Sequence, residues 1–227
     1  MVAHVLLLLA ACVPPSVIGL RSDATMPLTS ELSAAWGAFP EFTEDDDYTL
    51  AEASVAGVQA RQRLSNRVAF STSFGAVPSM LDEAVWGAGD LELQVQAIAE
   101  EPVDLQVTVG VDGYVLGEPD STPSVALGTH LGLFLSRRLP GDLHPFLGGK
   151  INPVFVQGKP YPWIQYGGGL SWRPVLDSAT RGLLAVEASR YEGFGVNFLE
   201  EGGGDPGDIQ TWGFLVQAGA SFGPTYR

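Results

Sequence analysis

The chain has 227 residues, a formal net charge of −14 and only 12 lysines plus arginines. This acidity excludes nucleic acid as a partner, because phosphates require a basic surface, and it disfavours attachment to anionic lipid through a polybasic patch. Beyond the leader no apolar run approaches about 18 residues, which excludes a helical membrane protein. The single cysteine excludes a disulfide framework and a cysteine-based zinc site.

Residues 1–20 have the pattern of an export leader. Residues 5–11 form a short apolar core, and the tetrapeptide Leu9-Ala10-Ala11-Cys12 closes it. This tetrapeptide resembles the bacterial lipobox, in which the cysteine is lipidated and becomes the new N-terminus. The resemblance implies lipid attachment at Cys12. The alternatives are an ordinary cleaved signal peptide that runs on to Leu20, and an accidental match.

Residues 21–65 differ in pattern from the rest and are expected to form a periplasmic linker. The acidic run 44–47 lacks the glycine and the spaced ligands of a calcium loop, so it favours a solvated segment. Residues 49–52 fit a capping box and open a helix-compatible stretch over 51–64. Because its apolar face is small, we expect a surface or tethering helix and not a plug inside a barrel.

From residue 66 onward the chain repeats one pattern eight times. About ten residues alternate between apolar and polar or small side chains, and a break rich in glycine, proline or aspartate follows. Strand side chains point to opposite faces with period two, so each repeat predicts an amphipathic strand. The predicted strands are about 66–76, 89–100, 102–113, 123–138, 145–157, 161–173, 181–193 and 209–222. They predict one barrel domain over 66–227.

The last predicted strand alternates most clearly. One face carries Trp212, Phe214, Val216, Ala218, Ala220 and Phe222, and the other carries Gly213, Leu215, Gln217, Gly219 and Ser221. At about 3.3 Å per residue and a tilt of roughly 40°, Trp212 and Phe222 lie about 25 Å apart, the height of an outer-membrane apolar band. We expect membrane-interface aromatics at Phe70, Phe74, Trp172, Trp212 and Phe222. The alternative is that these are core aromatics of a soluble barrel.

The connections between the predicted strands alternate in length. Short breaks near 101–102, 140–142 and 174–180 would share one side, and longer ones at 76–88, 114–122 and 194–208 the other. Short periplasmic turns and longer external loops are typical of outer-membrane barrels. The break 158–160 is too short for this scheme. An even number of strands closes without an edge, and eight leave an interior that side chains fill, so no solute pore is expected.

The polar faces decide between a membrane barrel and a soluble one. A lipocalin-like carrier of a small apolar ligand would turn its apolar faces inward and its polar faces to water. The polar faces of the strands at 123–138, 161–173 and 209–222 contain glycine, serine, glutamine and one histidine, but no lysine, arginine, aspartate or glutamate within the alternating runs. Such faces suit a packed lumen better than solvent.

A lumen network is predicted from the charged residues on the inward faces. Lys150 should lie near at least one carboxylate, because charges inside a filled barrel must be paired. The predicted network comprises Glu92, Asp104, Asp112, His130, Lys150 and Glu187. His130 has Ser136, Glu187 and Ser189 as candidate neighbours, but it lies mid-strand and no fixed-spacing motif supports a nucleophile. We therefore expect no catalytic residue, metal or cofactor.

Taken together, residues 66–227 resemble the small eight-stranded outer-membrane barrels of Gram-negative bacteria. The expected fold is all-β: an eight-stranded antiparallel up-and-down transmembrane β-barrel with a short N-terminal extension. The resemblance implies a place in the cell envelope, contact with outer-membrane lipid, and recognition by the barrel-insertion machinery through the aromatic end of the last strand, although residues 223–227 follow Phe222. The expected function is a structural or surface-interaction role without catalysis, with an extracellular or periplasmic protein partner unidentified. The alternatives are a lipid-anchored lipocalin-like carrier and a lipid-modifying outer-membrane enzyme.

Overall fold

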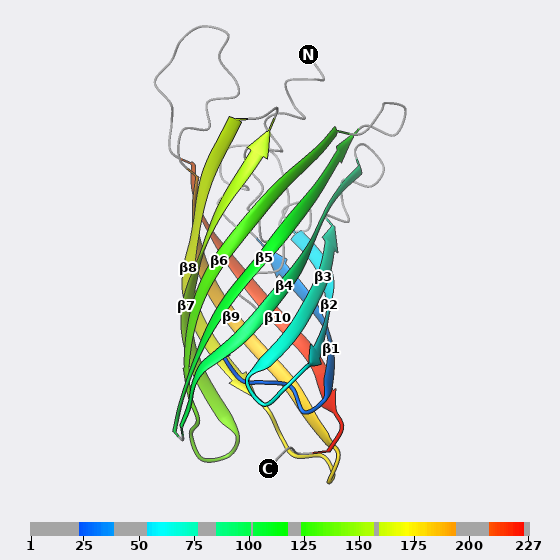
Figure 1. Ribbon diagram of the computed structural model, residues 1–227, viewed down its shortest axis with the longest axis vertical. Coiled ribbons are helices and arrows are strands. Elements are labelled where there is room, and N and C mark those ends of the chain that lie inside the picture. The colour runs from blue at the N-terminus through cyan, green and yellow to red at the C-terminus, as the bar shows by residue number, and fades with distance from the viewer. Residues whose placement is uncertain are drawn as a thin grey trace, which may run out of the picture.

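The computed structural model describes residues 23–38, 54–76, 85–100, 102–117, 124–156, 159–193 and 209–224, and none of them is helical. The strands are β1 (Ser30–Ala38), β2 (Ser54–Arg63), β3 (Val68–Ala76), β4 (Val85–Glu100), β5 (Val103–Gly117), β6 (Ser124–Arg137), β7 (Leu143–Val156), β8 (Lys159–Trp172), β9 (Thr180–Gly193) and β10 (Ile209–Phe222). Each pairs antiparallel with its neighbours in sequence, and β1 pairs with β10, so the sheet is a closed up-and-down barrel (Figure 1). Among the described residues no helix is long and apolar enough to cross a bilayer.

The barrel has ten strands, so the prediction of eight is wrong. Strands β1 and β2 lie where a linker was expected, and β2 occupies most of the stretch predicted as a helix. Alanine explains the error: it occurs at both inward and outward positions of β1, and it favours helices in isolation. The period-two signal is therefore weak, and pairing with β10 and β3 determines the conformation. The predicted capping box lies outside the described residues.

The other eight strands confirm the predicted elements to within a few residues. Two details differ from the simple alternation. A bulge between Gln96 and Ile98 interrupts the pattern of β4, so Ile98 pairs with Leu105 where a strict repeat would use Ala97. Proline enters β7 and β8 at neighbouring positions, where Pro153 pairs with Pro162. These prolines explain why the alternation is less regular in both strands, since proline cannot donate to a ladder.

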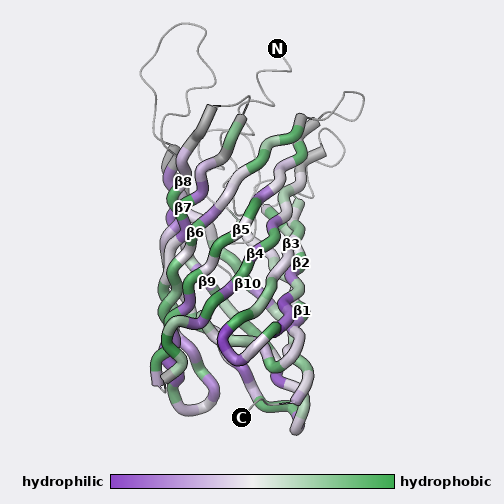
Figure 2. Tube along the Cα trace, viewed as in Figure 1, coloured by the Kyte–Doolittle hydropathy of each residue, from purple (hydrophilic) through white to green (hydrophobic). Residues whose placement is uncertain are grey.

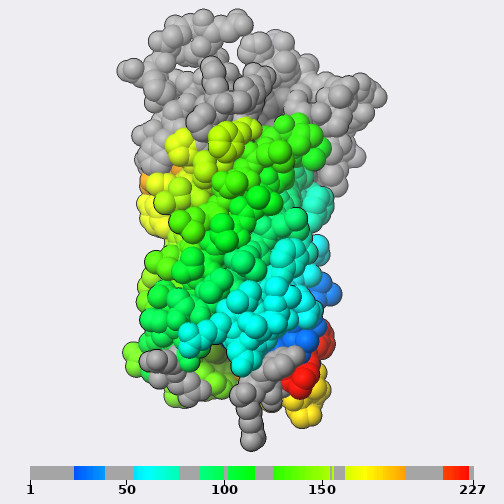
Figure 3. Space-filling model, viewed as in Figure 1, coloured from blue at the N-terminus to red at the C-terminus, as the bar shows by residue number. Residues whose placement is uncertain are grey.

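The apolar faces point outward. In β10 the side chains of Trp212, Phe214 and Val216 are 40%, 52% and 45% exposed, whereas Leu215 and Gln217 are 7% and 4% exposed. The same alternation runs around the wall, and Figure 2 shows hydrophobic and hydrophilic residues interleaved along the strands. Figure 3 shows the strands as one continuous wall on the face in view. The orientation predicted for the last strand is confirmed.

Strand connections differ in length at the two ends of the barrel. At one end, the turn end, the strands are joined by residues 64–67, 101–102, 138–142 and 173–179. In the turn after β6, Gly141 and Asp142 have φ values of 80° and 59°, a left-handed conformation that these residue types tolerate. At the other, the loop end, the joining segments are 39–53, 77–84, 118–123, 157–158 and 194–208. Strands β4 to β8 extend further toward the loop end than β1 to β3 (Figure 1).

Glycines inside the barrel make room for large side chains. A Cβ atom on Gly110 would lie 2.5 Å from His130 Cε1 and from the carbonyl oxygen of Leu91. A Cβ atom on Gly148 would overlap the ring of Phe134, which is fully buried. The lumen is thus packed by aromatic and polar side chains that need glycine opposite them, which accounts for glycines within strands.

Candidate functional site

The lumen contains a central cluster of five side chains from four adjacent strands: Glu92 of β4, Asp112 of β5, His130 of β6, and Lys150 and Asn152 of β7. All five are buried. Period two places each of them on the inward face, and the register of neighbouring strands brings them to a similar level of the barrel.

His130 lies between the two carboxylates of this cluster. Its Nδ1 atom is 3.0 Å from each carboxylate oxygen of Asp112, and its Nε2 atom is 2.9 Å from Glu92 Oε2. A neutral imidazole donates from one nitrogen only, whereas an imidazolium donates from both. With an imidazolium the cluster holds two negative and two positive charges, so the buried charges are balanced.

Lys150 supplies the second positive charge of the central cluster. Its Nζ atom is 3.0 Å from Glu92 Oε2 and 5.7 Å from the centroid of the Phe134 ring. Asn152 donates from Nδ2 to Asp112 Oδ2 at 3.2 Å. The cluster therefore links β4, β5, β6 and β7 across the lumen through charge-assisted hydrogen bonds.

The other two predicted network residues lie apart from this cluster. Asp104 accepts a hydrogen bond from Gln96 Nε2 at 2.6 Å, and Glu187 accepts one from the hydroxyl of Ser189. The structure thus brings together four of the six predicted residues, Glu92, Asp112, His130 and Lys150. It adds Asn152, which shares a strand with Lys150.

The central cluster offers no nucleophile. None of its members is a serine, threonine or cysteine, and both ring nitrogens of His130 face carboxylates. Ser136 has no hydrogen-bond partner in the described part of the chain, and Ser189 donates to Glu187. Within the described ranges no group of three or more histidine, cysteine, aspartate or glutamate side chains has an arrangement that could hold a metal ion. The geometry suits a structural role, in which the cluster links strands across the lumen.

A second feature, absent from the sequence predictions, is a plug formed by residues 23–29. This segment crosses the lumen at the turn end before β1 begins (Figure 1). Ala24 and Pro27 are fully buried, Asp23 and Leu28 are buried, and Ala24 packs with Phe134. A plug was weighed from the sequence only for the stretch 51–64, most of which forms β2. Residues 23–29 were expected to be part of the linker, and they are too few to show any periodicity.

The plug is held by Asp23. Its carboxylate accepts hydrogen bonds from Nε and Nη2 of Arg173, and Ser171 donates to the same group at 2.6 Å. Burial alone would raise the pKa of Asp23, but the adjacent Arg173 guanidinium outweighs it and holds that pKa well below its ordinary value. Asp23 is therefore ionised wherever the barrel is folded near neutral pH.

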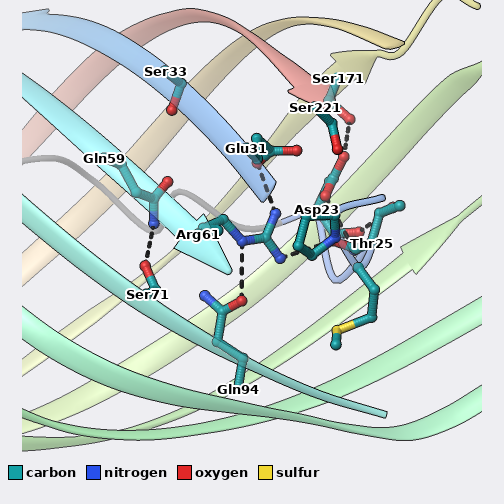
Figure 4. A network of polar contacts seen from close by, with 12 residues as sticks. Asp23, Thr25, Glu31, Ser33, Gln59, Arg61, Ser71, Gln94, Ser171 and Ser221 are labelled. Atoms are coloured by element: carbon teal, nitrogen blue, oxygen red, sulfur yellow. Dashed lines mark hydrogen bonds and ion pairs between the residues drawn. The ribbon is translucent and has the colours of Figure 1, made fainter. Parts of the chain in front are cut away.

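Arg173, Glu31 and Arg61 extend this turn-end network, and Figure 4 shows Glu31 and Arg61 beside Asp23. Arg173 Nη1 donates to Glu31 Oε2 at 2.6 Å, and Arg61 Nη1 donates to Glu31 Oε1 at 2.9 Å. Arg61 also donates from Nη2 to the carbonyl oxygen of Thr25 at 2.8 Å. Two carboxylates and two guanidiniums thus neutralise one another, and one of the guanidiniums also bonds the backbone of the plug.

The turn-end network and the central cluster are joined by hydrogen bonds. Arg61 Nε donates to Gln94 Oε1 at 3.0 Å, and Gln94 Nε2 donates to Glu92 Oε1 at 2.7 Å. Polar side chains therefore run without interruption from the plug to the central cluster. Next to Asp23 and Arg173 the remaining cavity measures about 10 Å³, which is room for a single water molecule at most.

The backbone of the plug is fixed to the wall. Leu28 N donates to Ser221 Oγ at 2.7 Å, and Thr29 N donates to the carbonyl oxygen of Phe222 at 2.8 Å. Arg63 N in turn donates to the carbonyl oxygen of Thr29 at 2.7 Å. The plug therefore forms hydrogen bonds with β10 and β2, the two strands that flank β1.

The predicted interface aromatics all face outward. Phe70, Phe74, Trp172, Trp212 and Phe222 are exposed, with Trp172 and Phe222 at the turn end of their strands and Trp212 near the loop end of β10. The sequence did not predict the polar side chains that lie near Trp212. Arg190 lies over the Trp212 ring at 5.6 Å, and Tyr166 donates to Glu192 at 2.7 Å. Cys12, the predicted lipid attachment site, lies outside the described residues.

Sequence reasoning missed Asp23, Glu31, Arg61 and Arg173. Arg61 and Glu31 occupy inward positions of strands that were not recognised, so their charges read as those of a solvated linker. Arg173 follows β8 directly; it was the last residue of the predicted strand 161–173, and no role was predicted for it. The available signal was Arg61, a charge that follows the outward positions Val58 and Ala60 at the alternating inward position, which in a barrel strand points to a buried partner.

No protein-family model matches the chain, and no curated protein sequence matches it. In fold it is similar to the outer membrane protease OmpT from Escherichia coli, with 8% identity, 86% of this chain and 93% of that chain covered, and a TM-score of 0.42. It is similar to LpxR from Salmonella typhimurium, with 8% identity, coverage of 85% and 100%, and a TM-score of 0.47. It is also similar to the beta domain of the Bordetella autotransporter BrkA, with 12% identity, coverage of 86% and 100%, and a TM-score of 0.43. The assignment as a closed antiparallel barrel rests on its own strand order and outward apolar face.

Proposed function

We propose that this protein is an outer-membrane β-barrel with a closed lumen and a structural or surface-interaction role, without transport or catalysis. The observation that carries the proposal is the unbroken series of paired side chains from Asp23 to His130. A solute crossing this lumen would have to separate buried ion pairs, and each uncompensated buried charge costs several kcal/mol.

The outward face supports placement in a membrane. Leucine, valine and aromatic side chains cover the wall, and closure of the sheet leaves no unpaired edge. In this placement the turn end faces the periplasm and the loop end faces outward. Two cysteine variants test it: a spin label at Val216→Cys should be accessible to oxygen dissolved in lipid, and one at Gln217→Cys should not. Equal accessibility of both would contradict the placement.

Conductance tests the closed lumen. Wild-type protein reconstituted into planar bilayers should give no unitary current steps, while a general porin added to the same bilayers should. Insertion is checked by the shift in gel mobility on boiling that folded barrels show. Regular current steps from protein that passes this check would contradict a closed lumen.

The segments at the loop end support an outward, solvated surface. Residues 39–53, 77–84, 118–123 and 194–208 contain aspartate or glutamate and no lysine, arginine or histidine. Replacing residues 43–48 with a glycine-serine linker should leave the heat-modifiable band unchanged, because in sequence they lie between β1 and β2, outside the pairings described for the barrel. A loss of the folded band would assign this segment to the barrel itself.

Export and anchoring complete the proposal. The leader over residues 1–20, lipidation of Cys12 and delivery by the barrel-insertion machinery are inferred from the sequence. Cells fed labelled palmitate should label the wild type and not Cys12→Ala. Label in both variants, or in neither, would remove lipidation from the proposal and leave an ordinary cleaved signal.

The two alternative functions receive less support from the geometry. A lipocalin-like carrier needs an apolar internal cavity, whereas the described lumen is lined by polar as well as aromatic side chains, with charged groups such as Glu92 and Lys150 paired at its centre. A lipid-modifying enzyme needs a free base, whereas His130 is held between Glu92 and Asp112. His130→Asn should therefore leave the lipid composition of an expressing cell unchanged. A changed lipid profile would favour the enzyme.

A further inference from the structure

The hydrogen-bond ladder between β6 and β7 is interrupted near the middle of the wall. Pairing with β7 stops at Gly128 and resumes at Leu131, and the residues between them are not paired with that strand. By register, Thr129 lies opposite Pro153 at this position. Proline has no N–H group, so the strand that faces it lacks a donor there.

The direction of the proline nitrogens shows which group loses its donor. On its other side Pro153 pairs with Pro162 of β8, and two prolines can face each other only at a non-hydrogen-bonded position of the ladder. The backbone N and C=O of Pro153 therefore point to β6, and those of Pro162 point to β9. The carbonyl oxygen of Thr129 consequently has no donor on β7. In a wall that faces hydrocarbon this costs free energy, because no water replaces the missing partner.

An apolar groove adjoins this position on the outside of the barrel. Its volume is about 650 Å³, within the range of about 300–1,000 Å³ that small-ligand sites occupy. Its floor contains the cross-strand neighbours Gly89 and Gly113, and a Cβ atom on Gly113 would meet nothing within 4 Å. The outward side chains that line the groove are those of Leu91, Val111, Leu127, Phe155, Thr72 and Thr129.

The two threonines of the groove differ in their hydrogen bonds. Thr72 donates from Oγ1 to the carbonyl oxygen of Asp90 at 3.0 Å. The side chain of Thr129 is exposed, and within the described part of the chain its hydroxyl makes no hydrogen bond. Thr129 therefore brings an unbonded hydroxyl and a carbonyl oxygen without a ladder donor to a groove that is otherwise apolar.

The depth of Thr129 determines which part of a lipid it meets. At about 3.3 Å per residue and a tilt of roughly 40°, Thr129 lies about 20 Å from the turn end of β6, in an apolar band about 25 Å tall. It therefore lies in the leaflet at the loop end, near the depth where acyl chains join their headgroups. Ester linkages offer only acceptors at this depth, whereas amide linkages and hydroxylated acyl chains offer donors.

We infer that the groove binds an acyl chain of a lipid in the loop-end leaflet, that this lipid carries a hydroxyl or an amide N–H at its linkage, and that this group donates to the carbonyl oxygen of Thr129. This rests on the proposed placement of the barrel across a membrane. The lipid donor replaces the N–H that Pro153 lacks, and the chain fills the space over Gly113. Lipids linked by esters alone fit the groove but leave the carbonyl oxygen unbonded, so they bind more weakly.

The test uses three probes of equal chain length: methyl tetradecanoate, methyl 3-hydroxytetradecanoate and N-methyltetradecanamide. Full-length protein is placed in phosphatidylcholine nanodiscs, and the methyl resonances of Val111 and Leu127 report binding. The hydroxylated ester, the amide or both should bind about fivefold more tightly than the plain ester, as expected for one hydrogen bond of about 1 kcal/mol. The probe that binds more tightly identifies the donor, and it should shift the ¹³C resonance of the Thr129 carbonyl, which the plain ester should not.

Two proline variants form a matched pair. Pro153→Ala supplies the missing N–H to β6, so the preference for probes with a donor should disappear. Pro162→Ala also adds an N–H, but it faces β9, so the preference should persist. Gly113→Leu fills the groove and should abolish saturable binding of all three probes.

The outcomes separate the two proposals. Protein that gives no heat-modifiable folded band in phosphatidylcholine contradicts the membrane barrel. With the band present, equal affinities for the three probes overturn the lipid inference alone, and so does a preference that survives in Pro153→Ala. If Pro153→Ala does not fold, the Thr129 carbonyl resonance of the wild type decides, and an unchanged resonance overturns the inference. Methyl shifts that depend on protein concentration without any probe would assign the groove to a second copy of the chain and overturn it as well.

Discussion

Arg173 holds the carboxylate of Asp23 with two of its nitrogens, across 150 positions of sequence. Asp23 precedes the first strand and Arg173 follows the eighth, so this pair fixes the plug to the far wall of the barrel. Both side chains are buried, which makes the pair sensitive to the loss of either partner.

Asp23→Ala is expected to destabilise the folded barrel by about 3 kcal/mol, because it leaves Arg173 buried with Glu31 as its remaining carboxylate. Urea unfolding in detergent micelles measures the change. Asp142→Asn is the matched control, since it removes the exposed charge that pairs with Arg138 at the same end, keeps a residue type that tolerates a φ of 59°, and should cost less than about 1 kcal/mol. Equal losses in the two variants would mean that the plug contributes nothing.

Acid should weaken the barrel through Asp23. The folded-state pKa of this carboxyl lies below its ordinary value of 3.8. A depressed pKa contributes stability that is present above the ordinary value and is lost as pH falls below it toward the folded-state pKa. Between neutral pH and about pH 4 the difference in stability between the wild type and Asp23→Asn should stay constant, and from there down to about pH 3 it should begin to narrow. A difference that does not narrow over this lower range would contradict the assignment.

Lys150→Met is expected to destabilise the barrel by about 3–5 kcal/mol, because Glu92 then remains buried with one fewer cation. The double variant Glu92→Gln/Lys150→Met should cost less than the sum of the single variants, since it removes both charges of a pair whose Nζ and Oε2 atoms are 3.0 Å apart. A double-mutant cycle from urea midpoints gives the coupling. Strict additivity would show that the central cluster does not act as a unit.

Two glycines of β5 provide a test of lumen packing. Gly110→Ala should cost about 1–3 kcal/mol, because the new Cβ atom would lie 2.5 Å from His130 and from a backbone carbonyl. Gly113→Ala should be neutral or slightly stabilising, since nothing lies within 4 Å of that Cβ position and the unfolded chain loses freedom. The thermal midpoint of the heat-modifiable band distinguishes them, and equal midpoints would contradict a packed lumen at Gly110.

Strong alternation made most of the wall predictable. In β5, β6 and β10 large apolar residues alternate with small or polar ones, so both the strand and its outward face could be read from the sequence. In β1 alanine stands on both faces, and in β2 the inward face carries valine, glycine and glutamine before Arg61, so the alternation is weak and pairing with β10 and β3 makes these residues extended. Local sequence carries no information about such partners.

The lumen was predictable where its residues share a recognised strand. Lys150 and Glu92 could be placed on inward faces, because period two fixes orientation once a strand is known. Their mutual distance depends on register across β4 to β7, which the sequence does not specify. Asp23 could not be placed at all, since its position depends on a guanidinium distant in sequence and on no repeating pattern.

The bonds of the plug also constrain the order of folding. β1 and β10 come from opposite ends of the chain, so their pairing is the contact of longest sequence separation in the sheet, and such contacts form late. Next to this pairing, Leu28 and Thr29 donate hydrogen bonds to Ser221 and Phe222 at the end of β10. We therefore expect β1 to pair with β10 in the same folding step in which the N-terminal segment docks. A folding intermediate that has not reached this step would expose the unpaired edges of both strands.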